Sequence, residues 1–371
     1  MINKERIVNS FMDYVKISSP TKQEGKFAEF ISKELEALGM EVTIDDAGPK
    51  VGSDTGNVIA KLKGNAPGET ILFSCHMDTV SPGVDIKPEI RDGVIYSDGT
   101  TVLGGDDKAG IAAVVEAIRA IKENNLPHAD IEIAFSIFEE GGLHGAKNID
   151  YSTLNAKRAF ILDSGGEPGQ IIVKGPAQDK IDVKVLGKSA HAGVAPEEGI
   201  SAIMVASGAI SRMKLLRIDE ETTANIGTIE GGSVTNIVTP EVIIKAEARS
   251  LDNDKLKAQS DHMVECFEAA AKEFGAKVEC DVVRMYSAFS VDVDAPIVKT
   301  TIKACENIGL KPFTAASGGG SDTNVYNANG ITAINLGIGE KKPHTLEEHL
   351  HIKDLVDSSR LVMELIKIHL S

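Results

Sequence analysis

Short apolar strands alternate with helices along most of the chain, and this alternation most restricts its fold. The runs NVIAKL (57–62), ETILFSCH (69–76), IEIAFSIFEE (131–140) and RAFILD (158–163) have the length and composition of buried strands. A long helical segment, DKAGIAAVVEAIRAIKENN (107–125), separates the second run from the third. Two helices precede the first strand, and Thr21 and Glu24 have capping-box spacing before the second helix. The pattern predicts an α/β domain whose mostly parallel sheet is flanked by helices.

The pattern changes near residue 178. QDKIDVKVLGKSAHAG (178–193) alternates polar and apolar residues, as a half-exposed strand does. A helix, two strands, a second helix and a last strand follow, and this β-α-β-β-α-β order predicts a ferredoxin-like α/β sandwich. Helix and strand alternation resumes near residue 290. We therefore predict a discontinuous first domain, 1–177 and 290–371, with a smaller domain inserted at 178–289.

Composition excludes several classes of function. A net charge of −16 makes the chain a poor binder of nucleic acid, because phosphate contacts need a basic surface. No apolar run approaches the roughly 18 residues that span a bilayer, and the opening residues lack the apolar core of a secretory signal. The four cysteines form no CxxC pair and favour free thiols in a reducing compartment. We expect a cytoplasmic protein without nucleic-acid or membrane partners.

Acidic and histidine residues collect where the predicted strands end. They are His76 with Asp78, Asp106 with Asp107, Glu139 with Glu140, Asp163, and His344 with His349 and His351. In open parallel sheets, sites form at the carboxyl ends of the strands, so we expect most of these side chains to meet. Acids gathered there would repel one another without a cation. Oxygen and imidazole ligands without cysteine favour zinc, with cobalt or manganese as alternatives.

Each of these features also has an ordinary structural interpretation. A lone strand-end aspartate such as Asp163 is more often a cap or turn residue, and a pair such as Glu139–Glu140 is usually a solvated turn. His349 and His351 fit loop positions or places outside the ligand set better than ligand positions. The ordered set favours two metal ions that share a carboxylate and activate a water, with a further acid as general base.

This ordered set, together with LGGDDKAGIA and VTNIVTPE, resembles the M20 family of co-catalytic metallopeptidases, and within it the peptidase T group of tripeptide aminopeptidases. The resemblance runs from SPTKQEG to KPHTLEEH and so covers nearly the whole chain. It implies that one zinc ion binds His76, Asp106 and Asp163, and that the other binds Asp106, Glu140 and His344. It also implies that Glu139 is the general base, that Asp78 orients His76, and that the peptide bond after Asp106 is cis.

The inserted segment resembles the lid of that family, which is commonly also its dimerisation domain. The resemblance implies a homodimer formed through this domain. It places His191 at the tetrahedral intermediate, often from the partner subunit, and Asn236 and Arg249 at the substrate carboxylate or oxyanion. The segment GGGSDTNVY (318–326) resembles the substrate-side loop of the family. Its candidate substrate-binding residues are Gly319, Gly320 and Ser321.

The implied activity is metal-dependent cleavage of the amide bond of a small peptide, with a dinuclear zinc site, a bridging water and a glutamate base. An aminopeptidase acting on tripeptides is the first expectation. A carboxypeptidase or an N-acyl-amino-acid deacylase of the same family remains an alternative, as does a non-catalytic protein that binds metal or peptide.

Overall fold

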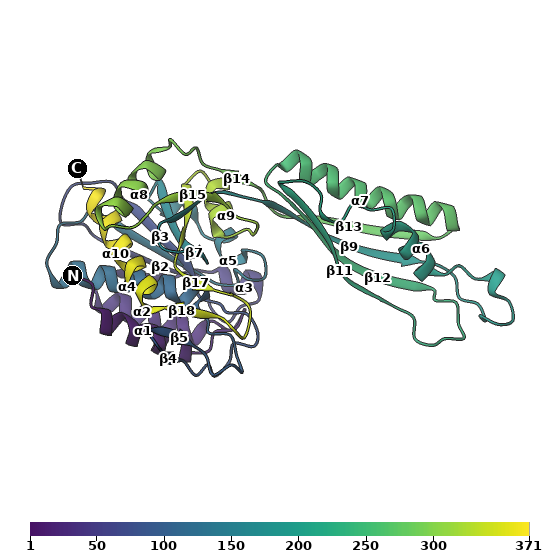
Figure 1. Ribbon diagram of the computed structural model, residues 1–371, viewed down its shortest axis with the longest axis horizontal. Coiled ribbons are helices and arrows are strands. Elements are labelled where there is room, and N and C mark those ends of the chain that lie inside the picture. The colour runs from purple at the N-terminus through teal and green to yellow at the C-terminus, as the bar shows by residue number, and fades with distance from the viewer. Residues whose placement is uncertain (371) are drawn as a thin grey trace. The chain divides into compact units, whose positions relative to one another are not determined.

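The computed structural model describes residues 1–370 and separates into two compact units (Figure 1). Unit 1 contains Met1–Gly175, Ser290–Ser317 and the described residues from Ser321 onward. Unit 2 contains Pro176–Phe289 and Gly318–Gly320. None of the helices within residues 1–370 combines the length and apolarity needed to cross a membrane.

Unit 1 is built on a nine-stranded mixed sheet. Its centre holds the parallel strands β6 (Ile131–Ser136), β3 (Ile71–His76), β7 (Arg158–Ser164) and β16 (Thr332–Gly337), in that order. The flanking strands are β1 (Glu41–Ile44), β2 (Val58–Leu62), β8 (Gln170–Gly175), β14 (Phe289–Ser290) and β15 (Phe313–Ala316). The first two and β8 join the sheet antiparallel, while β15 lies parallel to β8. The predicted α/β fold with a mostly parallel central sheet is confirmed.

Alternation along β3 decides what lies on each face of this sheet. Ser74 accepts a hydrogen bond from the hydroxyl of Tyr326 in α9, so one face of the strand packs against that helix. Cys75 points the other way, toward α4, where a Cβ added to Gly110 would lie 2.9 Å from its sulfur. Cys75 is therefore a buried packing residue, and His76 shares the face of Ser74.

The helices of unit 1 pack against the sheet and against one another (Figure 1). Helix α4 packs against β3, β7, α1 and α10, and α8 packs against α10. Their bounds are α1 (Lys4–Lys16), α2 (Gly25–Ala37), α3 (Ala47–Val51), α4 (Gly105–Glu123), α5 (His144–Lys147), α8 (Pro296–Asn307), α9 (Asp322–Ala328) and α10 (Ile352–Ile368). Two 3₁₀ turns, Tyr151–Thr153 in unit 1 and Pro196–Glu198 in unit 2, complete the helical elements.

The capping box predicted at the start of α2 is wrong. Glu24 is fully buried, and its carboxylate accepts hydrogen bonds from the backbone N–H groups of Lys22 and Phe138 and from the Ser53 hydroxyl. The Thr21 hydroxyl donates to Asp78 Oδ2 at 2.8 Å instead of capping the helix. Tertiary partners therefore replace the local capping contacts and tie the N-terminal segment to the loops that follow β3 and β6.

A small four-stranded sheet lies beside the main one, in the order β17–β18–β5–β4. Its strands are β4 (Glu89–Arg91), β5 (Val94–Tyr96), β17 (Glu340–Lys341) and β18 (His349–His351). Because β17 and β18 pair antiparallel, they fix both ends of the loop that carries His344.

Unit 2 is a five-stranded antiparallel sheet in the order β10–β11–β12–β9–β13. Its elements are β9 (Ala177–Leu186), α6 (Ala202–Ile210), β10 (Leu216–Arg217), β11 (Thr222–Gly231), β12 (Glu241–Ser250), α7 (Asn253–Phe274) and β13 (Lys277–Tyr286). Both helices pack on one face of the sheet around a core that includes Ile181, Val205 and Phe267 (Figure 1). The order of the four long strands is the ferredoxin-like one, with β10 as a short addition.

Candidate metal centre

His76 is the last residue of β3, and its buried ring faces two carboxylates. Its Nε2 lies 2.9 Å from Asp106 Oδ1 and 3.9 Å from Asp163 Oδ1. Asp163 comes from the neighbouring strand β7, where Asn335 of β16 accepts its N–H at 3.0 Å and donates to its carbonyl at 2.8 Å. The carboxyl ends of adjacent parallel strands thus bring His76 and Asp163 together, as the sequence predicts.

Asp106 lies between two imidazoles. Its Oδ1 contacts His76, and its Oδ2 lies 3.0 Å from His344 Nε2. The same His344 nitrogen is 2.9 Å from Glu140 Oε1. The five residues predicted as ligands therefore form one connected cluster, with the Asp106 carboxylate at its centre.

The cluster has the dimensions of a metal site. Ligand atoms around a tetrahedral zinc ion lie about 3.3 Å apart, given bond lengths of about 2.0–2.1 Å. The interresidue distances here are 2.9 to 3.9 Å. Glu140 Oε1 is buried and contacts His344 Nε2 at 2.9 Å. A donor set of imidazole nitrogens and carboxylate oxygens fits a divalent cation such as zinc, cobalt or manganese.

Asp107, which the sequence places beside Asp106 without a predicted role, is also a member of the cluster. Ligand atoms of His76, Asp107 and Asp163 lie within 4.8 Å of one another, as do those of His76, Asp106 and Glu140. Asp107 Oδ2 accepts the His76 backbone N–H at 3.1 Å, while its buried Oδ1 has no hydrogen-bond partner. The peptide bond between Asp106 and Asp107 is cis. Two successive acids at the start of a helix usually only stabilise its first turn. The position of Asp106 and Asp107 beside His76 is what marks them as candidate ligands.

Asp78 supports the neighbouring loop more directly than it supports His76. Its carboxylate accepts the backbone N–H groups of Glu139 at 2.9 Å and Glu140 at 3.3 Å, as well as the Thr21 hydroxyl. His76 Nδ1 lies 2.8 Å from the carbonyl oxygen of Asp78 but 3.5 Å from its carboxylate. The backbone of Asp78 therefore orients the imidazole, and the side chain of Asp78 holds the Glu139–Glu140 turn.

The electrostatics of the cluster favour an added positive charge. Burial, followed by repulsion from Asp163, raises the pKa of Glu139 well above its usual value. Burial also raises the pKa of Asp163, although His76 opposes that shift. Hydrogen bonds to Asp106 and Glu140 raise the pKa of His344 to about 10. Burial thus disfavours the charged forms of these carboxyl groups, and a bound divalent cation would favour them.

Two of the predicted substrate residues lie together in unit 2. His191 and Ile237 form an isolated antiparallel bridge, Ala192 N–H donates to the Asn236 carbonyl at 2.9 Å, and Val238 N–H donates to the Ala190 carbonyl at 2.9 Å. The paired segments follow the ends of β9 and precede β12, where Leu186 lies opposite Glu241. His191 and Asn236 are both exposed.

Arg249 lies at the other end of the same sheet. It pairs with Gln178 near the start of β9, and its guanidinium donates to Glu247 from Nε at 3.0 Å and from Nη2 at 3.1 Å. Glu241 and Arg249 are eight positions apart on β12, which corresponds to about 26 Å of extended strand. Unit 2 therefore presents His191 with Asn236 at one end and Arg249 at the other.

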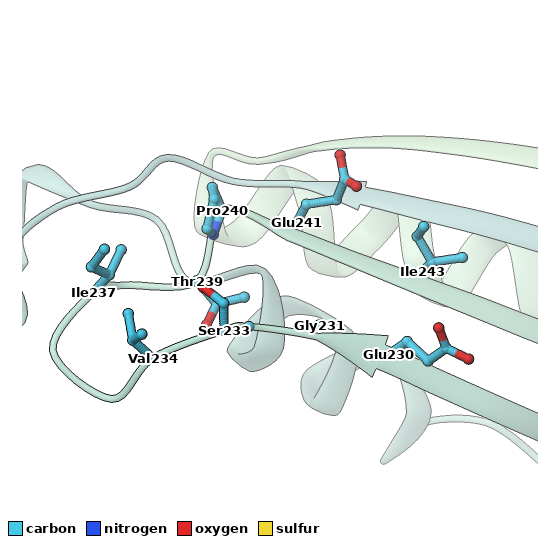
Figure 2. Close-up of a pocket in the computed structure, with 10 residues that line it drawn as sticks. Glu230, Gly231, Ser233, Val234, Ile237, Thr239, Pro240, Glu241 and Ile243 are labelled. Carbon is cyan, nitrogen blue, oxygen red and sulfur yellow. The ribbon is translucent and has the colours of Figure 1, made fainter.

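A hollow of about 360 Å³ lies beside the loop between β11 and β12. Figure 2 shows Val234 and Ile237 on this loop, and Glu241 and Ile243 on the adjoining strand. Its lining contains no histidine, cysteine or basic residue, so the hollow adds no catalytic group to the loop that carries Asn236.

The glycine-rich segment before α9 contains structural and candidate substrate residues side by side. A Cβ on Gly320 would lie 2.2 Å from the Tyr286 ring, so this position requires glycine for close packing within unit 2. Ser321 is the N-cap of α9 and forms a capping box with Asn324. A helix-capping role is thus sufficient to explain Ser321. Gly319 immediately precedes Gly320, in the part of the segment that belongs to unit 2.

The chain is similar to known peptidases along its whole length. Residues 72–368 match the family model described as peptidase family M20/M25/M40. The protein YqjE of Bacillus subtilis (strain 168) is 45% identical over 99% of both chains. A peptidase T of Clostridium perfringens is 27% identical, with 98% of this chain and 99% of the relative covered.

Two solved structures extend this similarity to the fold. The aminopeptidase PepT of Bacillus cereus ATCC 10987 is 47% identical, with a TM-score of 0.92 and 99% of each chain covered. A tripeptidase of Staphylococcus aureus is 42% identical, with a TM-score of 0.96 and the same coverage.

Proposed function

Since this chain belongs to the M20/M25/M40 family of peptidases, we propose that it is a metal-dependent aminopeptidase that removes the N-terminal residue of tripeptides. The observation that carries the proposal is the position of Asp106, whose two carboxylate oxygens each face an imidazole. The similarity to an aminopeptidase and to a tripeptidase over 99% of the chain supports the choice of substrate.

The proposed cofactor is a pair of zinc ions, with cobalt or manganese as possible substitutes. His76, Asp106 and Asp163 would hold one ion, and Asp106, Glu140 and His344 would hold the other. A pair of divalent ions bound in this way lowers the pKa of a shared water and polarises the carbonyl of the scissile bond.

Glu139 is the proposed general base. It is buried at the edge of the cluster, and Asp78 fixes its backbone. Its carboxylate would accept a proton from the attacking water and return it to the nitrogen of the leaving amine. The resemblance to the M20 family implies ligand roles for Asp163 and Glu140 and the role of general base for Glu139.

The geometry of unit 2 supports a homodimer as the active form. Arg249 and the His191–Asn236 pair lie at opposite ends of one sheet, so one copy of unit 2 cannot bring both to the same substrate. In the proposed dimer, Arg249 would bind the substrate carboxylate or oxyanion in its own chain, because its planar fork matches a carboxylate. The partner subunit would supply a histidine and an asparagine equivalent to His191 and Asn236, and the histidine would donate a hydrogen bond to the oxyanion.

A peptide panel tests the substrate assignment. Purified protein with added zinc or cobalt is assayed on dipeptides, tripeptides and tetrapeptides, together with N-acetylated and C-amidated tripeptides. We expect release of the N-terminal residue from free tripeptides and none from the N-acetylated form. Hydrolysis that tolerates the acetyl group but fails on the C-amide would instead favour a carboxypeptidase or deacylase. No hydrolysis of any peptide would favour a binding protein.

A further inference from the structure

We propose that Glu348 is a positioning residue that holds the metal-bridging Asp106 in place by binding the backbone of residues 103–106. Its Oε2 accepts the N–H groups of Leu103 at 2.8 Å and Gly104 at 3.1 Å. Its Oε1 accepts the N–H groups of Gly105 at 2.6 Å and Asp106 at 3.2 Å. One carboxylate thus binds four successive peptide N–H groups, and the last of them belongs to the bridging residue itself.

These contacts account for a carboxylate that is only 2% exposed. An ionised carboxylate has about four acceptor positions, and burying it is costly unless they are used. The N–H groups at the start of a helix have no partner within the helix and favour a negative charge. Asp106 and Asp107 have non-helical dihedral angles, so the regular part of α4 begins after them. Glu348 therefore accepts hydrogen bonds from the N–H groups of an irregular backbone segment that have no partner within the helix.

The loop is shaped around this carboxylate. Gly104 has a φ of +72°, which glycine adopts without strain. A Cβ on Gly105 would lie 3.0 Å from Glu348 Oε1, closer than such contacts usually are. The two glycines of LGGDD thus permit both the turn and the close approach of the backbone to Glu348.

Glu348 and His344 belong to one segment and act on the same residue. His344 Nε2 contacts the Asp106 carboxylate, while Glu348 binds the Asp106 N–H. The segment is fixed immediately after Glu348, because His349 and Leu350 of β18 pair with Tyr96 and Ile95 of β5. The loop between β17 and β18 therefore contacts both the side chain and the backbone of Asp106. Loss of the Glu348 contacts would let the shared ligand of both proposed ions move.

The test compares Glu348→Gln with two matched variants. Glu347→Gln changes the adjacent exposed glutamate, whose partner is Lys342. Glu116→Gln changes a glutamate of α4 that is 1% exposed and pairs with Arg6. For each protein, zinc and cobalt affinities are measured by chelator competition without substrate, the cobalt absorption spectrum is recorded, and kcat and KM are determined on a tripeptide.

We expect Glu348→Gln to weaken binding of at least one ion by about 10–100-fold, as loss of groups that orient metal ligands does. We also expect an altered cobalt spectrum and a lower kcat with little change in KM. Glu347→Gln should match the wild type. Glu116→Gln should lower the melting temperature but leave metal affinity and spectrum unchanged. Should Glu348→Gln fail to fold, Gly105→Ala disturbs the same contact from the other side and should weaken metal binding in the same direction.

The proposal is overturned if Glu348→Gln binds both ions with wild-type affinity and spectrum, or if it behaves like Glu116→Gln. The inference rests on the proposed dinuclear site, but the metal titrations need no peptide. A wild-type chain that binds metal and cleaves no peptide would overturn the proposed function alone. A wild-type chain that binds no metal would overturn both.

Discussion

The carboxylate of Asp78 accepts the backbone N–H of Glu139 at 2.9 Å, which joins the ends of two neighbouring strands, β3 and β6. The Asp78→Asn variant should disturb this turn, because its amide can keep only one oxygen acceptor among three donors. We expect kcat to fall by about 10–100-fold with metal content retained. Steady-state kinetics and metal analysis check this expectation. Thr21→Val removes only one of the donors and should lower kcat less. Equal kcat values for Asp78→Asn and the wild type would contradict the proposed role of the Asp78 carboxylate.

Substitutions of the adjacent residues Glu139 and Glu140 should have different effects on activity and metal content. Glu139→Ala should reduce kcat by about 10²–10⁴-fold while metal remains bound, because it removes the proposed base and no ligand. Glu140→Ala should lower metal content as well as activity, because it removes a proposed ligand. Metal analysis after gel filtration, alongside kinetics, separates the two cases. Retained activity in Glu139→Ala would refute the base assignment.

Metal removal should abolish activity reversibly. EDTA treatment is expected to remove hydrolysis of tripeptides, and zinc or cobalt should restore it. Because ions that bind only the folded state stabilise it, metal should also raise the melting temperature in a concentration-dependent way. Activity assays and thermal unfolding with and without metal provide the measurements. Full activity in protein shown to be metal-free would contradict the proposal.

Mixed dimers test whether His191 acts across subunits. Glu139→Ala and His191→Ala chains should each be inactive alone. In a mixed dimer, the chain with an intact Glu139 would receive an intact histidine from its partner. After random exchange of equal amounts, about a quarter of wild-type activity should return, since half of the dimers are mixed and each has one complete site. If His191 acts within its own chain, the mixture should stay inactive.

His369 should make stability fall on the acidic side of neutrality. Burial lowers the pKa of this histidine, whose Nδ1 donates to the Leu365 carbonyl and whose Nε2 has no hydrogen-bond partner. Its unfolded form therefore binds a proton more readily than its folded form, so its contribution is complete above pH 6.5 and is lost as the pH falls through that value. The free energy of unfolding should fall less between pH 7 and pH 5.5 in His369→Phe than in wild type. Parallel pH curves for the two proteins would contradict this assignment.

Periodicity and strand-end chemistry predicted the elements that carry the proposed metal ligands. Strand β3 is buried along its whole length, so local pattern and tertiary environment agree there. The resemblance to the M20 family, and the expected peptidase, are confirmed by the family match and the two solved structures. The small sheet escaped prediction because β17 and β18 are too short to show a period.

Local patterns misled where side chains find distant partners. Thr21 and Glu24 have the spacing of a capping box, but both turn to loops after β3 and β6. Glu348 follows another glutamate in a polar segment, which indicates a solvated turn, yet its carboxylate is buried against residues more than 240 positions earlier. Only three-dimensional contact reveals such roles, because no local spacing encodes them.

The binding of the Asp106 backbone by Glu348 affects when the protein can become active during its synthesis. His76, Asp106, Glu139, Glu140 and Asp163 are synthesised long before His344 and Glu348. Until that late segment emerges, the loop of Asp106 lacks its anchor and the cluster lacks one imidazole. A nascent chain could thus form most of its central sheet while still unable to cut the peptides around it. Hydrolysis would begin only after the segment with His344 and Glu348 has been synthesised.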